Sequence, residues 1–130
     1  MSQAARDRIE GILSAYDFSR APTIIDIGGG NGALLMAILR AHPLARGVLV
    51  DVPHVAAEAR NSLASTELAS RVEIREGDLF QGPLPADGDL YILSNIIHDW
   101  DDQHALQILR NCRVSMPGTG RLLLIEGSKK

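Results

Sequence analysis

Residues 23–32 read TIIDIGGGNG, a short β-branched apolar run that stops at a dense cluster of glycines. A continuous apolar run of this kind is typical of a strand buried on both faces, and the glycines after it predict a tight turn. Residues 33–41 are strong helix formers ended by His42 and Pro43, and residues 47–51 (GVLVD) form a second apolar run. The sequence therefore predicts a strand, a glycine-rich loop, a helix and a second strand in succession.

The other segments continue this alternation of helices and strands. The expected elements are helices over residues 3–16, 54–68 and 102–114, and strands over residues 71–75, 89–97 and 121–126. We therefore predict an α/β fold with a Rossmann-like, doubly wound parallel sheet of five strands in the order 3-2-1-4-5. Sheets of this kind bind ligands at the carboxyl ends of their strands, here at the switch between the first and fourth strands.

Composition narrows the classes of protein further. The chain has 130 residues, of which 45% are hydrophobic and 22% charged, as expected for one globular domain with no room for a second. No apolar run approaches the roughly 18 residues of a membrane span, and no signal peptide opens the chain. Cys112 is the single cysteine, so we expect no internal disulfide and a cytoplasmic location. The 13 basic and 16 acidic residues are scattered, which argues against nucleic acid as a partner.

The glycine-rich loop indicates a ligand but does not identify it. Glycines at positions 28, 30 and 32 let the backbone turn tightly and let a ligand approach the amides at the start of the next helix. A dinucleotide site fits the same loop, with Ala33 in the last motif position and Asp51 about 20 residues after the loop begins. A Walker A loop does not fit, because no Lys-Ser or Lys-Thr follows the glycines. A purely structural role in packing the strand against the helix also remains open.

Two aspartates follow the second and third predicted strands. Asp51 stands where a carboxylate can accept both hydroxyls of a ribose, although it could instead cap the turn before Pro53. Asp78 stands at the next position of the same crevice, where it can accept from an exocyclic amine such as that of adenine, with Leu79 and Phe80 as apolar cover. A solvated turn aspartate is the alternative for Asp78.

Four segments together resemble a known family, the S-adenosylmethionine-dependent O-methyltransferases of the plant caffeate and bacterial antibiotic type. They are 26–32 (DIGGGNG), 50–55 (VDVPHV), 77–80 (GDLF) and 98–102 (HDWDD), and their order and spacing match the family's core over residues 20–126. The resemblance implies S-adenosylmethionine as cofactor. Its implied contacts are Gly28 and Gly30 for the methionine portion, Asp51 for the ribose, Asp78 and Leu79 for the adenine, and Trp100 packed near that ring.

The same resemblance implies the catalytic residues. His98 matches the general base that takes the proton of the acceptor hydroxyl, and Glu126 matches the residue that helps to orient it. The chemistry suits these residue types, because a phenol with a pKa near 10 needs a base poised near neutrality, which imidazole supplies. A packed or capping histidine and a surface glutamate are the structural alternatives.

Metal binding is the other interpretation of the segment around His98. Aspartates at 99, 101 and 102 and His104 are legitimate ligands, but capping of the following helix explains the acids more simply, so we expect no metal. Cys112 lies between apolar residues of a predicted helix and is expected to be a core residue.

The chain also departs from the family. The family's N-terminal dimerisation domain and its strands after the fifth have no counterpart here, so we expect residues 1–130 to form the cofactor-binding core only, with residues 1–20 as a leading helix. Plant members carry a cofactor-contacting lysine four residues before the histidine, where this chain has Ser94. The expected function is methyl transfer to a hydroxyl of a small molecule, and this hydroxyl is expected to be phenolic. The alternatives are an inactive cofactor-binding fragment and an NAD-dependent oxidoreductase. An exposed edge at residues 122–125, or the apolar surface that the family's absent helices leave bare, predicts a homo-oligomer.

Overall fold

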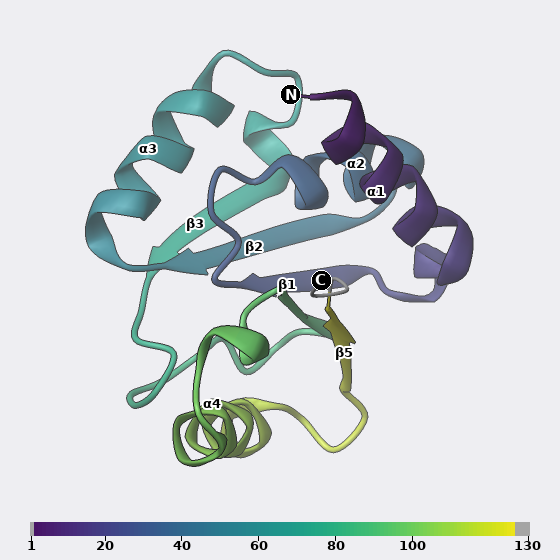
Figure 1. The fold of residues 1–130 in the computed structure, drawn as a ribbon. Coiled ribbons are helices and arrows are strands. Elements are labelled where there is room, and N and C mark those ends of the chain that lie inside the picture. The colour runs from purple at the N-terminus through teal and green to yellow at the C-terminus, as the bar shows by residue number, and fades with distance from the viewer. Residues whose placement is uncertain (1, 127–130) are drawn as a thin grey trace.

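The computed structural model describes residues 2–126, and for His98 it describes the backbone alone. Its centre is a five-stranded sheet in the order β3-β2-β1-β4-β5, with every neighbouring pair parallel (Figure 1). The strands are β1 (Thr23–Ile27), β2 (Arg46–Asp51), β3 (Val72–Glu76), β4 (Leu90–Ser94) and β5 (Arg121–Ile125). The predicted fold class and strand order are confirmed.

Helices cover both faces of the sheet. The elements are α1 (Gln3–Ala15), α2 (Ala33–Ala41), α3 (Pro53–Ala64) and α4 (Asp102–Ser115), with short 3-10 turns η1 (Phe18–Arg20), η2 (Ala69–Arg71) and η3 (Ile97–Asp99). In Figure 1, α1, α2 and α3 lie on one side of the sheet and α4 on the other. Two separate apolar cores result: Ile24 and Leu49 pack toward α2 and α3, whereas Ile25 and Val50 belong to the core that contains Ile108 of α4.

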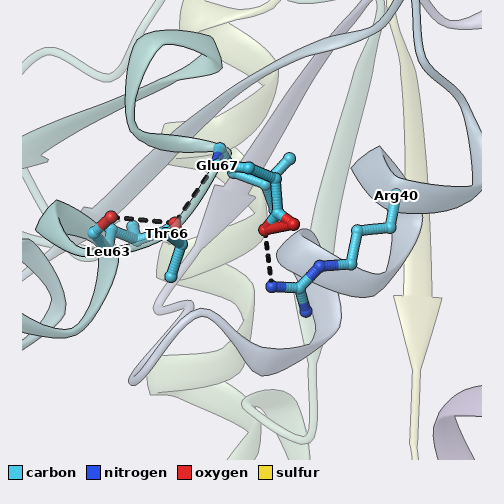
Figure 2. Close-up of polar contacts among 5 residues, drawn as sticks. Arg40, Leu63, Thr66 and Glu67 are labelled. Atoms are coloured by element: carbon cyan, nitrogen blue, oxygen red, sulfur yellow. Dashed lines mark hydrogen bonds and ion pairs between the residues drawn. The ribbon is translucent and has the colours of Figure 1, made fainter.

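The predicted helix over 54–68 is too long at its C-terminal end. The helix stops at Ala64, because Thr66 folds back: its hydroxyl donates to the Leu63 carbonyl at 2.8 Å and accepts from the Leu68 backbone N–H at 3.3 Å. Hydroxyl side chains that bond to nearby backbone in this way compete with helix continuation. Figure 2 shows this turn and the ion pair beside it, in which Arg40 of α2 lies 2.9 Å from Glu67.

The predicted strand over 89–97 is also too long. β4 ends at Ser94, because Asn95 adopts a left-handed backbone conformation (φ 55°) that no continuing strand allows. The chain then turns through η3 and leads into α4. The remaining elements match their expected ranges to within one or two residues, and α2 matches at both ends.

Local details agree with several sequence expectations. His42 caps the C-terminal end of α2, since its N–H donates to the Ile38 carbonyl at 3.0 Å. Cys112 is fully buried against the sheet, and burial raises the pKa of its thiol to about 11, which suits a core residue. Within residues 2–126, no helix combines the length and the apolar composition that crossing a membrane requires.

The last strand lies at one edge of the sheet. In the described part of the chain, β5 pairs with β4 and with no further strand. Leu124 of this strand is 45% exposed, and Leu122 lines an apolar hollow of about 660 Å³ between β5 and the end of α4.

Candidate functional site

The carboxyl ends of β1 and β2 are tied together at the glycine-rich loop. The backbone N–H of Gly28 donates to the Val50 carbonyl at 2.7 Å. Asp51 then reaches back from the end of β2, and its Oδ2 accepts from the Gly30 N–H at 3.0 Å while its Oδ1 accepts from the Val52 N–H at 2.8 Å. Asp51 is therefore aimed at the loop, and it also caps the turn that follows β2.

The glycines of this loop are required by its conformation. Gly28 and Gly30 have φ values of 70° and 63°, which side chains rarely tolerate. Gly29 lies directly on the sheet, since a Cβ there would stand 2.8 Å from Leu49 Cγ and 2.9 Å from Asp26 Cγ. At Gly30, by contrast, a Cβ would meet no atom within 4 Å. The loop thus packs against the core at Gly29 and is open to a ligand at Gly30.

A cavity of about 290 Å³ lies between this loop and α1. Its polar lining includes Arg8 of α1, Asp26 of β1 and Ser94 at the end of β4, together with Asn31 of the loop and Asn95. The Arg8 guanidinium donates to Ser94 Oγ at 3.0 Å, across 86 positions of sequence. Sequence reasoning missed Arg8, because nothing in an amphipathic helix marks which of its exposed charges faces a site. The sequence analysis named Ser94 only as the residue in place of the plant members' lysine, although its position at a strand's carboxyl end also marks it.

Asp26 is the buried polar residue of this cavity. It is 2% exposed, and among the described residues its Oδ1 has no hydrogen-bond partner. Burial, and secondly the charge of Asp51, raise the pKa of Asp26 from 3.8 to about 7. A buried carboxyl without a partner is costly, so it is the kind of group that a cationic ligand would stabilise. The sequence analysis quoted Asp26 in the motif but assigned it no role.

The segment expected to hold adenine lies on the far side of Gly28. A Cβ on Gly28 would stand 3.7 Å from Leu79 Cδ1, which places Leu79 beside the glycine loop. The exposed Asp78 accepts from the Phe80 N–H at 2.8 Å, so it does form the turn that was its structural alternative. Trp100 packs edge-on against Phe80, with ring centroids 4.8 Å apart, and is itself 42% exposed. The structure therefore brings Leu79, Phe80 and Trp100 together at one wall of the crevice.

The two expected catalytic residues lie after the neighbouring strands β4 and β5. The backbone of His98 lies in η3, and its side chain is outside the described part of the structure. Glu126 directly follows β5 and is exposed. Because Ser94 and Ile125 are register partners, both residues stand at the carboxyl edge of the sheet, on the same side as the glycine loop.

The acidic segment after His98 caps a helix. Asp101 is the N-cap of α4: its carboxylate accepts from the His104 N–H at 2.9 Å, and His104 Nδ1 lies 2.8 Å from the same oxygen. The backbone hydrogen bond is the main cause that lowers the pKa of Asp101. Over residues 2–126, with the side chain of His98 set aside, no three potential ligands among His, Cys, Asp and Glu lie close enough to hold a metal ion.

Comparison with known proteins identifies the family. A family model described as an O-methyltransferase domain matches residues 1–128. The chain belongs to this family. Over 115 residues it is 54% identical to the phenazine O-methyltransferase PhzM of Lysobacter antibioticus and 45% identical to the mitomycin biosynthesis 6-O-methyltransferase of Streptomyces lavendulae. Each alignment covers 88% of this chain and 33% of the relative, so the chain spans about a third of the length of the curated relatives it matches.

A solved structure of the family supports the fold as well. The O-methyltransferase NcsB1 from neocarzinostatin biosynthesis, in complex with S-adenosylmethionine and 2-hydroxy-5-methyl naphthoic acid, matches with a TM-score of 0.83 and 37% identity. The match covers 88% of this chain and 35% of that one. The resemblance drawn from the four sequence segments is thereby confirmed at the level of family and fold.

Proposed function

We propose that this chain binds S-adenosyl-L-methionine at the carboxyl ends of β1, β2 and β4, as the cofactor-binding core of an O-methyltransferase. The observation that carries the proposal is the Asp51 carboxylate held against the open side of the glycine loop, 3.0 Å from the Gly30 nitrogen. A carboxylate at the end of the second strand is placed to accept ribose hydroxyls, and the loop beside it leaves space for the rest of a nucleoside. We assign the whole of residues 1–130 to this core.

The charges of the neighbouring cavity fit an amino acid. Arg8 offers guanidinium donors and Ser94 a hydroxyl at one wall, which suits a carboxylate. Asp26 offers a buried carboxylate beneath the loop, which suits an ammonium or sulfonium group. The methionine portion of S-adenosylmethionine carries a carboxylate, an ammonium group and a sulfonium group. A cavity lined by Arg8, Ser94 and Asp26 next to Gly28 is therefore chemically matched to it.

The wall formed by Leu79 and Trp100 fits the adenine. Leu79 supplies an apolar surface beside Gly28, and the exposed indole of Trp100 supplies a flat aromatic one. Asp78, one residue before Leu79, supplies an acceptor for the exocyclic amine. These roles for Gly28, Gly30, Asp51, Asp78, Leu79 and Trp100 are the ones that the sequence resemblance implied, and they remain proposals.

For catalysis we propose His98 as the general base and Glu126 as the residue that orients it. Bound S-adenosylmethionine supplies an activated methyl group, so the protein has to bind and align the acceptor and to receive a proton. A phenolic hydroxyl is almost fully protonated at neutral pH, and an imidazole is the side chain suited to take that proton. The proposed acceptor is a small molecule with a hydroxyl, most simply a phenol, and the proposed location is cytoplasmic.

Two alternatives were open from the sequence. Membership of the O-methyltransferase family removes the support for an NAD-dependent oxidoreductase. A core that binds the cofactor without catalysing remains the second candidate for the 130 residues alone. Parallel calorimetric titrations with S-adenosylhomocysteine and NAD test the cofactor: micromolar binding of the first and none of the second is expected, and the reverse would contradict the proposal. Methyl transfer to a panel of phenols then separates enzyme from binder.

We also propose that the 130-residue chain self-associates. Among residues 2–126, no strand pairs with the outer edge of β5, and open strand edges tend to pair with other chains. Leu124 and the hollow beside it add apolar area at the same edge. Sedimentation equilibrium at micromolar concentration is expected to give a mass above 14.0 kDa, whereas a clean monomer would rule out self-association.

A further inference from the structure

One face of α4 holds the segment that follows β3. Three side chains spaced four residues apart make the contacts: Gln107 Nε2 donates to the Phe80 carbonyl at 3.4 Å, Asn111 Nδ2 donates to the Leu79 carbonyl at 3.1 Å, and Ser115 Oγ accepts from the Leu84 N–H at 3.3 Å. Residues four apart lie on one helix face, so a single row of polar side chains on α4 forms hydrogen bonds with the backbone of this segment.

Asn111 is the central contact of the row. Its amide also lies 3.5 Å from the Asp78 carbonyl, so two successive carbonyl oxygens of the segment converge on one side-chain nitrogen. Residues 77–89 contain no helix or strand, and several of them are proline or glycine. Because regular structure does not fix this backbone, side-chain donors such as Asn111 must do so.

The direction of these carbonyls decides what the opposite side of the segment presents. A trans peptide unit points its C=O and its N–H in opposite directions, and the described residues contain no cis peptide. With the Asp78 carbonyl turned toward Asn111, the Leu79 N–H points away from α4. The Leu79 carbonyl also turns toward Asn111, so the Phe80 N–H points away from α4 too, and the Asp78 carboxylate accepts from it on that side. The Leu79 side chain lies beside Gly28.

We propose that Asn111 is a positioning residue that sets the base specificity of the nucleoside site. By holding the Asp78 and Leu79 carbonyls, it fixes the Asp78 carboxylate as an acceptor for the amine of adenine and the Leu79 N–H as a donor to the ring nitrogen beside it. A base with a carbonyl in place of the amine, such as hypoxanthine, would meet the carboxylate with the wrong polarity. This inference rests on the proposed nucleoside site.

The test compares S-adenosylhomocysteine with S-inosylhomocysteine, two ligands that differ only at the base. Calorimetric titration of the unaltered chain is expected to show a clear preference for the adenosyl ligand. Asn111→Leu keeps the branched side chain but removes the donors, and Asn111→Asp keeps the shape but cannot donate. In both variants the ratio of the two dissociation constants, which measures the preference, is expected to fall about fivefold, mostly through weaker binding of the adenosyl ligand. Asn111→Gln, which keeps an amide, is expected to restore part of it. Asn61→Leu, at an exposed position of α3, is the matched control and should leave the preference unchanged.

The outcomes separate this inference from the function on which it rests. An unaltered chain that prefers the adenosyl ligand, with variants that keep the full preference, overturns the role of Asn111 alone. The same holds if both ligands weaken equally, since that is what a merely structural residue would cause. An unaltered chain that binds neither ligand contradicts the proposed nucleoside site, and the inference with it. Circular dichroism of each variant confirms that it is folded before titration.

Discussion

Asp51 Oδ2 accepts a hydrogen bond from the backbone N–H of Gly30 at 3.0 Å, which joins the end of β2 to the glycine-rich loop. The same carboxylate is the group that we propose as the ribose ligand. One side chain therefore both shapes the loop and faces the ligand, and it is the natural first position to alter.

Asp51→Ala is expected to weaken S-adenosylhomocysteine binding by about tenfold or more. The reason is the loss of charge-assisted hydrogen bonds, each worth about 1.5–3 kcal/mol. Calorimetric titration measures the effect, and Asp87→Ala, at an exposed loop position, serves as the control. If the folded Asp51→Ala chain binds as tightly as its parent, Asp51 is a turn cap only.

Arg8→Ala is expected to weaken S-adenosylhomocysteine binding by about tenfold but to leave adenosine binding unchanged. The guanidinium beside Ser94 is proposed to hold the carboxylate of the amino acid portion, which adenosine lacks. Arg20→Ala, at another exposed arginine, should change neither affinity. Equal losses for both ligands would show that Arg8 supports the fold of the crevice and does not bind the carboxylate.

Asp26 is expected to make the stability of the ligand-free chain depend on pH. Because the pKa of Asp26 rises from 3.8 to about 7 on folding, the folded state holds a proton that the unfolded state releases. The free energy of unfolding should therefore fall by up to about 4 kcal/mol as pH rises from about 4 to about 7. Above that pH it should stay level. Asp26→Asn should remove this fall and unfold at higher urea concentration than the parent at pH 8. An unchanged pH profile would show that Asp26 does not carry the proton.

His98→Ala is expected to lower kcat for a phenolic acceptor by roughly 10²–10⁴ with little change in cofactor affinity. The measurement needs an acceptor pocket, so it is made in a chimera that joins this chain to the flanking segments of the phenazine O-methyltransferase of Lysobacter antibioticus. His54→Ala, at the exposed start of α3, is the control. An unchanged kcat in the His98 variant would make this histidine structural.

Sequence patterns predicted most of the fold because its three central strands, β1, β2 and β4, are buried on both faces. β1 reads as an apolar run interrupted only by Asp26, β2 is apolar from Gly47 to Val50, and the breakers around α2 mark both of its ends. Where the prediction failed, a local side chain or backbone conformation decided the boundary: Thr66 ends α3 early, and Asn95 ends β4.

The site was less predictable than the fold. Asp51 and the loop of Gly28 and Gly30 lie at strand ends, where the topology itself marks a ligand site. The hydrogen bond from Arg8 to Ser94 joins residues 86 positions apart, and the one from Asn111 to the Leu79 carbonyl joins residues 32 positions apart. No short-range pattern encodes such contacts, because they depend on how α1 and α4 pack on opposite faces of the sheet.

The most direct test of the account is an amide nuclear magnetic resonance titration of the 130-residue chain with S-adenosylhomocysteine. We expect the largest shift changes at Gly28, Gly30, Val52 and Leu79, together with the indole of Trp100, the only tryptophan. Those groups surround the carboxyl ends of β1 and β2. An unchanged spectrum, or changes confined to the hollow at the opposite end of the sheet between Phe18 and Leu44, would contradict the proposed cofactor site.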